Sequence, residues 1–69
     1  MSDWVVVRHK DTREIVHQEE HASVSPKRSA DLLTQRYLEL RERWPPEYEI
    51  LTGFGPTLEE FLRLCDSSD

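Results

Sequence analysis

The densest cluster of residues that could bind a metal is formed by His17 and His21, with Glu19 and Glu20 between them. Two histidines four positions apart converge on one ion when they share a helix face. This segment instead leaves a predicted strand and enters a polar connection. A transition-metal site also needs three or four converging ligands and the hydrogen-bonded groups that orient them. We therefore predict surface histidines, His9 included, and no bound metal.

The single cysteine, Cys65, is the next candidate for chemistry. A nucleophilic thiol needs an exposed, electropositive setting near a helix N-terminus. Cys65 lies near the end of the last predicted helix among acidic residues, a setting that raises the pKa of a thiol. We expect it to pack as a small apolar residue. One cysteine also excludes an intrachain disulfide framework and suits a reducing compartment.

No other group of residues indicates catalysis. The segment Gly53-Phe54-Gly55 precedes a helix, as phosphate-binding turns do, but it lacks their longer glycine pattern and their lysine. Glu59 and Glu60 occupy the helix start where an anion would bind. Neighbouring carboxylates of this kind diverge on a helix and do not share a site. The sequence predicts a non-enzymatic protein with no catalytic residues and no cofactor.

Nucleic-acid binding is the alternative function, because basic residues fall on a predicted hairpin and at a predicted helix start. They are Arg8, Lys10, Arg13, Lys27 and Arg28. Aromatic side chains that could stack on bases are Trp4, Tyr37, Tyr48 and Phe54. The formal net charge of −5 has the wrong sign for affinity to phosphates, and these aromatic residues fall on predicted core faces.

The element that organises the chain is the segment Trp4–Arg8, in which three valines follow a tryptophan. β-Branched and aromatic residues without alternation indicate a strand that is covered on both faces. A polar stretch and a second extended segment then predict a hairpin over residues 4–17. A loop of residues 10–12 would pair Val7 with Ile15, and this register gives matched apolar pairs. A loop of residues 11–13 would instead pair Val7 with His17. The turn contains no glycine, so we expect a non-glycine residue with positive φ.

A polar connection over residues 19–24 is predicted to lead into the longest element. Ser25 and Pro26 suit the N-cap and first position of a helix, which Pro45-Pro46 ends after about Trp44. An apolar stripe recurs at helical spacing along one side and consists of Ala30, Leu33, Tyr37, Leu40 and Trp44.

The remaining residues predict a third strand and a short helix. The strand covers residues 47–52 and is ended by the glycines and proline of residues 53–56. Thr57 and Glu60 are spaced as a capping box. One helix face then carries Leu58, Phe61, Leu62 and Cys65. Residues 66–69 are expected to fray.

This ββαβα order predicts one α+β domain over residues 1–69. A right-handed crossover through the long helix returns the third strand parallel to the second. If the third strand lies beside the first, the three-stranded sheet is antiparallel in the order 2-1-3, which places the apolar first strand in the centre as its composition requires. The long helix covers one face of the central strand. The other face requires the short helix, a second copy of the chain, or both.

The composition of the chain indicates its cellular location and the kind of protein it is. Apolar residues make up 36% of the chain and charged residues 33%, and six of the 14 acids lie after Pro45 against one arginine. No leader and no apolar run of membrane-spanning length is present, so we expect a cytoplasmic protein. The arginine- and glutamate-rich, lysine-poor composition resembles that of small accessory proteins of GC-rich bacteria and their phages.

We therefore predict an accessory or regulatory module that binds a protein partner or itself. A chain of 69 residues is marginally stable alone, and small domains often form two-fold dimers. We favour a homodimer over a monomer. The interface residues expected from the sequence are Trp4, Val6, Val16, Leu32 and Leu38.

Overall fold

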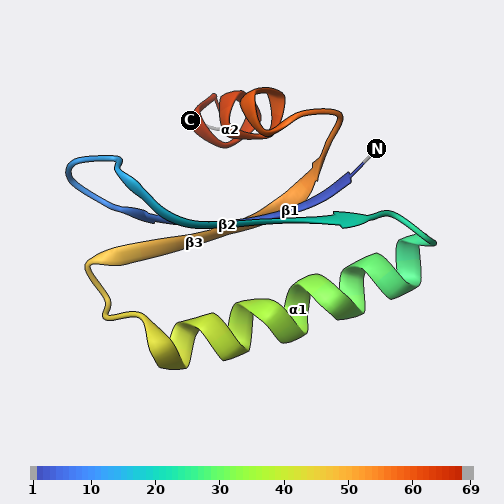
Figure 1. The fold of residues 1–69 in the computed structure, drawn as a ribbon, viewed down its shortest axis with the longest axis horizontal. Coiled ribbons are helices and arrows are strands. Elements are labelled where there is room, and N and C mark those ends of the chain that lie inside the picture. Colours follow the sequence, from blue (N-terminus) through green and yellow to red (C-terminus); the bar gives the residue numbers. More distant parts are fainter. Residues whose placement is uncertain (1, 68–69) are drawn as a thin grey trace.

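The computed structural model describes residues 2–67, which form a sheet with one helix on each face (Figure 1). The elements are β1 (Ser2–His9), β2 (Ile15–Ala22), α1 (Pro26–Arg43), β3 (Tyr48–Gly55) and α2 (Leu58–Asp66). The strand order is β2-β1-β3, and β1 is antiparallel to both neighbours. The predicted α+β fold and strand order are confirmed. No helix of residues 2–67 is long and apolar enough to cross a membrane.

The central strand β1 divides the core into two layers. The layer beneath α1 contains the buried residues Val5, Val7, Leu33 and Leu40. The layer beneath α2 contains Trp4, Val6 and Phe61. Each layer is small because a sheet of three strands offers little area to either helix. The short helix α2 therefore covers the second face of β1. The sequence allowed three ways to cover this face, namely the short helix, a second copy of the chain, or both.

Local signals set the ends of α1 as predicted. The Ser25 hydroxyl accepts a hydrogen bond from the Arg28 backbone N–H, which satisfies one of the unpaired donors at the helix start. At the other end Trp44 adopts an extended conformation, and its N–H still donates to the Leu40 carbonyl. Trp44 precedes Pro45, which disfavours the helical conformation. The helix therefore stops where its proline pair begins.

The hairpin between β1 and β2 does not have the register that apolar side-chain pairing favoured. Val7 pairs with His17, as in the second of the two predicted registers, and not with Ile15. Arg8 then pairs with Ile15, so a bulge at Val16 accommodates one extra residue. The backbone at Arg13 has a φ of 65°, which confirms the expected positive φ in a turn without glycine. The geometry of the turn therefore determined the register. Each matched apolar pair of the other register would have contributed less than about 1 kcal/mol of stability.

Two strands are longer than the sequence indicated. β2 continues through Glu19, Glu20 and His21, which were expected in a connection. Their side chains alternate between the two faces of the sheet, and backbone pairing with β1 supports an edge strand of polar residues.

β3 also continues beyond its predicted end at residue 52. It includes Gly53, Phe54 and Gly55, which were expected in a turn. The glycines are required by close packing and not by a turn, because neither has a positive φ. A Cβ at Gly53 would lie 2.8 Å from Cε1 of Phe61. Gly53 thus leaves room for the buried ring of α2.

Helix α2 is anchored at both ends. Thr57 caps its start by accepting from the Glu60 N–H, as the capping-box spacing predicted. Trp4 Nε1 donates to the Gly55 carbonyl just before the helix. At the far end Asp66, one of the residues expected to fray, is the last residue of α2, and its carboxylate accepts a hydrogen bond from Arg8. Of the remaining predicted frayed residues, 68 and 69 lie outside the described part of the chain.

Candidate protein-interaction surface

The five residues predicted to form an interface lie on different parts of the fold. Trp4 is 8% exposed and Val6 is fully buried, so α2 removes both from the surface. Leu32 is half-buried on α1, whereas Leu38 is 59% exposed on the same helix. Val16 is exposed at the bulge of β2. The exposed members of the predicted set do not form one continuous surface.

The basic residues of the nucleic-acid hypothesis are also separated. Arg8 is buried, and both Arg8 and Arg13 donate to the same oxygen of Asp66 at 2.8 Å. Both guanidinium groups are thus paired with Asp66, Arg8 in a buried position and Arg13 at the surface. Lys27 and Arg28 lie at the start of α1, beside the end of the sheet where Ser2 pairs with Ala22. The hairpin lies at the opposite end of the eight-residue strand β1, about 25 Å away at 3.3 Å per residue.

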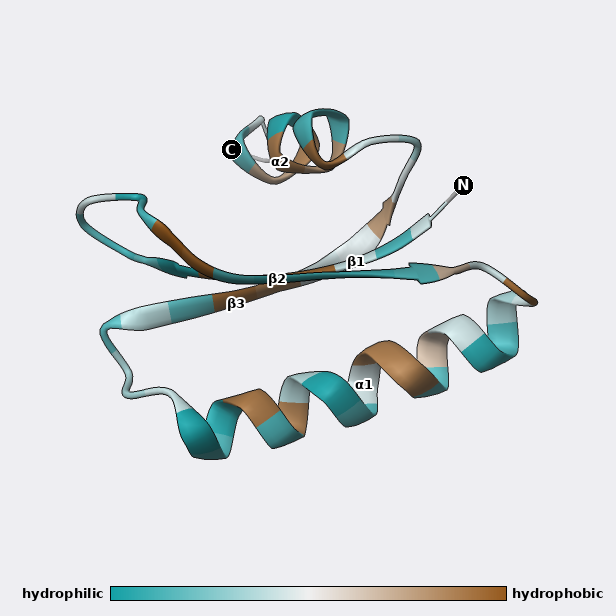
Figure 2. Ribbon diagram, viewed as in Figure 1, coloured by the Kyte–Doolittle hydropathy of each residue, from teal (hydrophilic) through white to brown (hydrophobic). Residues whose placement is uncertain are grey.

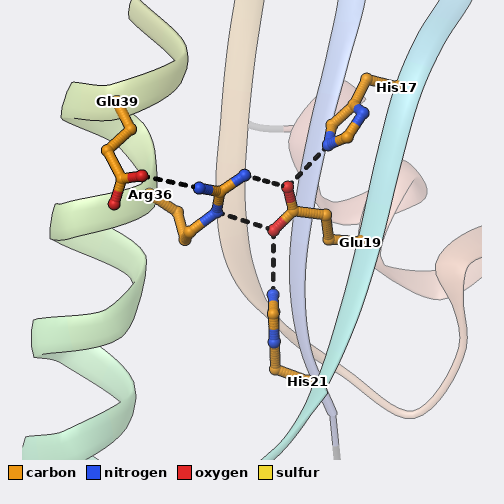
Figure 3. Close-up of polar contacts among 5 residues, drawn as sticks. All are labelled: His17, Glu19, His21, Arg36 and Glu39. Atoms are coloured by element: carbon orange, nitrogen blue, oxygen red, sulfur yellow. Dashed lines mark hydrogen bonds and ion pairs between the residues drawn. The ribbon is translucent and has the colours of Figure 1, made fainter.

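The residues first considered as metal ligands form a polar cluster between β2 and α1 (Figure 3). Glu19 accepts hydrogen bonds from Nε and Nη2 of Arg36. His17 Nε2 lies 2.6 Å from one oxygen of Glu19, and His21 Nε2 lies 2.9 Å from the other. Arg36 also donates to Glu39 on α1. A single carboxylate is therefore contacted by three side chains.

This polar cluster joins the edge strand to the helix. The hydrogen bond from Arg36 holds the pKa of Glu19 far below its ordinary value, against the opposing effect of its burial. Both oxygens of Glu19 are occupied by a guanidinium that would repel a cation. Among residues 2–67 no group of three or more ligating side chains could hold a metal ion. We assign the cluster the role of attaching β2 to α1.

Cys65 lies in the core layer beneath α2, as the sequence suggested. Burial raises the pKa of its thiol, and Arg8 opposes this effect only in part. A thiol of raised pKa is a poor nucleophile at neutral pH.

The largest group of exposed apolar side chains surrounds the outer edge of β3. Seven large apolar residues of the described chain are exposed, and four of them line hollows beside this edge. These four are Val24, Tyr37, Phe54 and Leu64. β3 is paired with β1 on one side only, and no strand of residues 2–67 lies on its other side. We call these four residues, together with Thr52 and Gly53, the β3 edge surface.

Three adjacent hollows follow this edge, and Phe54 lines all of them. The first lies at the start of α1 beside Val24 and Pro26. The second, of about 350 Å³, lies between β3 and α1 and is lined by Ala30, Leu33, Thr34, Tyr37, Thr52, Gly53 and Phe54. The third, of about 360 Å³, lies beside α2 and is lined by Thr52, Gly53, Phe54, Phe61, Leu64 and Cys65. These volumes are at the low end of small-molecule pockets and suit the insertion of apolar side chains.

The two edges of the sheet differ in how well they resist pairing with another strand. Natural edge strands are protected by charged residues and by bulges. β2 has both, since it carries Glu19, Glu20 and a bulge at Val16. β3 has no charged residue from Ile50 to Gly55. Figure 2 shows this contrast, with β2 hydrophilic along most of its length and β3 hydrophobic in its middle.

Sequence reasoning missed the β3 edge surface. Tyr37 was assigned to the buried stripe of α1, yet it is 38% exposed because the helix presents it at the open side of β3. Phe54 was placed in a turn that the structure does not contain. One signal was available, because the predicted strand order already placed the third strand at an edge.

Comparison of the chain with protein-family models, with curated proteins and with solved structures finds no match.

Proposed function

We propose that this protein is a non-enzymatic interaction module that binds another polypeptide along the outer edge of β3. In this mode of recognition an extended segment adds to the sheet through main-chain hydrogen bonds, and its side chains enter pockets on alternate faces. The observation that carries the proposal is an edge strand without charged residues from Ile50 to Gly55 and with an apolar hollow on each face of the sheet.

Two further features support this mode. The hollow beside α1 and the hollow beside α2 are both lined by Thr52 and Gly53, so one added strand would contact both. Both helices are fixed in place by caps and, for α2, by the Arg8–Asp66 ion pair. A binding groove with rigid walls loses little conformational freedom when it is filled.

A comparative capture experiment tests the proposal. The tagged full-length chain, its Phe54→Lys variant and its Leu38→Lys variant are each incubated with extract of the native cell, and the bound polypeptides are quantified. Leu38 is a matched control, since it is an apolar residue 59% exposed on α1 that lines none of the three hollows.

We expect a polypeptide, including an untagged copy of this chain, that the parent and Leu38→Lys retain and Phe54→Lys loses. Equal capture by all three chains would contradict the proposal.

A further inference from the structure

We infer that the polypeptide which occupies the β3 edge is a second copy of this chain, paired antiparallel through β3 about Gly53. The inference rests on the proposed function and names its partner. A two-fold axis midway between the two Gly53 residues and normal to the sheet would join two three-stranded sheets into one of six strands. It would leave both copies of α1 on one face and both copies of α2 on the other.

The distribution of charge is compatible with a second copy as the partner. Two like chains, each with a formal net charge of −5, avoid direct contacts between like charges where their contact surface is free of charge. One third of the residues in the chain are charged, yet none of those lining the three hollows is. A partner selected for its opposite charge would need acidic or basic groups in these hollows.

The strand register gives a reciprocal fit on the α1 side. With Gly53 opposite Gly53 of the second copy, Phe54 of each chain lies opposite Thr52 of the other, because antiparallel pairs keep a constant sum of positions. Thr52 lines the hollow between β3 and α1 together with Thr34 and Tyr37. Side chains directly opposite have Cβ atoms about 5 Å apart, which allows each Phe54 ring to reach the hollow of its neighbour.

The same register accounts for the α2 side. Gly53 and Leu64 line one hollow, so the pairing brings the two Leu64 side chains toward each other over the central glycines. The Phe61 ring fills the space directly above Gly53 and also lines this hollow, so the two leucines would meet beside that ring. Tyr37 of α1 and Leu64 of α2, both exposed in the single chain, would thus be covered by one symmetric contact.

Size also favours association. Each layer of the core holds only three or four buried apolar residues, and a domain of this length buries a smaller fraction of its surface than a larger domain does. A continuous six-stranded sheet would extend both layers across the contact. It would also remove the unprotected edge from solvent, where it would otherwise pair with any available strand.

Sedimentation equilibrium of the full-length chain, from micromolar to millimolar concentration, tests the inference. We expect a dimer of twice 8.2 kDa whose dissociation constant rises at least tenfold in Phe54→Lys and in Leu64→Lys but is unchanged in Leu38→Lys. The two test variants alter different elements, and circular dichroism confirms that each is folded before it is scored.

Cysteine cross-linking tests the register, on a Cys65→Ala background. We expect a mixture of Thr52→Cys and Phe54→Cys chains to form a mixed disulfide readily, since opposite Cα atoms fall within the range that a disulfide spans. Preferential cross-linking of Thr52→Cys to itself would overturn the register. A dimer insensitive to both lysine variants would overturn the site.

A strict monomer at all concentrations would overturn self-pairing. The proposed function would still hold for a monomeric chain if, in the capture experiment, Phe54→Lys failed to retain a different polypeptide that the parent binds. Failure of self-pairing and failure of the proposed function are therefore distinguishable.

Discussion

Replacement of Gly53 by alanine tests how α2 packs on the sheet. A Cβ at this position would lie 2.8 Å from Cε1 and 3.4 Å from Cδ1 of Phe61. The ring cannot move away freely because it is only 3% exposed, between Trp4, Val6 and the rest of α2. The new methyl group therefore forces either the strand or the helix to shift.

The magnitude follows from two opposing effects. Overpacking of a well-filled core costs about 1–3 kcal/mol. Alanine in place of glycine recovers about 0.5–1 kcal/mol because it restricts the unfolded chain and suits a strand better. We expect a net loss of about 1–2 kcal/mol in the free energy of unfolding. A domain of this size has about 3–10 kcal/mol in total, and each kcal/mol lowers Tm by about 4–8 °C.

Urea unfolding of the parent, Gly53→Ala, Phe61→Leu and the double variant gives the energy of interaction between the two sites. Because leucine lacks the ring atoms that the methyl group would meet, we expect Gly53→Ala to cost markedly less in the Phe61→Leu background. Gln18→Ala, an exposed position on β2 that lines none of the three hollows, is the control. An unchanged or raised stability of Gly53→Ala in the parent would refute the packing explanation for this glycine.

Three further predictions concern the contacts that hold the layers together. Glu19→Gln should lower the free energy of unfolding by about 2 kcal/mol by weakening charged hydrogen bonds to Arg36. The folded-state pKa of Glu19 lies below its ordinary 4.5, so the parent should lose this stability as the pH falls below about 4.5. Glu19→Gln should lose less stability over that pH range, and acid-unfolding curves of both chains measure the difference. Arg8→Ala should release Asp66, so that hydrogen exchange speeds up in the last turn of α2 and not in α1. Thr57→Ala should cost about 1 kcal/mol in urea unfolding through loss of the helix cap, and an unchanged midpoint would contradict that assignment.

The fold was predictable because its strongest signals are local and agree with one another. Three consecutive valines required a strand covered on both faces, and the Ser25-Pro26 start and Pro45-Pro46 end defined α1. With these elements fixed, the crossover rule and the apolar composition of the first strand left the order 2-1-3 as the natural topology.

The errors in the predicted fold arose mainly where the role of a residue depends on a contact with a residue far away in the sequence. Gly53 and Gly55 indicated a turn, but their role is to accommodate Phe61 from a helix that follows in the sequence. The hairpin register depended on Arg13 in a left-handed conformation, which side-chain pairing preferences do not report. Glu19 was assigned to a loop because its partner Arg36 lies 17 positions away on α1.

The candidate site was less predictable than the fold. An interface was expected where apolar residues fell off the helical stripe or faced an uncovered sheet, which gave Leu38 and Val6. The structure instead exposes members of the stripe itself, notably Tyr37, because the three-stranded sheet is too narrow to cover the side of α1 next to β3. The width of a sheet relative to its helix is a tertiary property that no local pattern encodes.

Hydrogen exchange measured at several protein concentrations tests the central claim most directly. If β3 is the surface on which a second copy binds, amide protection over residues 50–55 should rise with concentration while protection over residues 15–22 of β2 stays constant. The Phe54→Lys chain should show no such rise. Protection of β3 that is independent of concentration, or a rise confined to β2, would contradict the account.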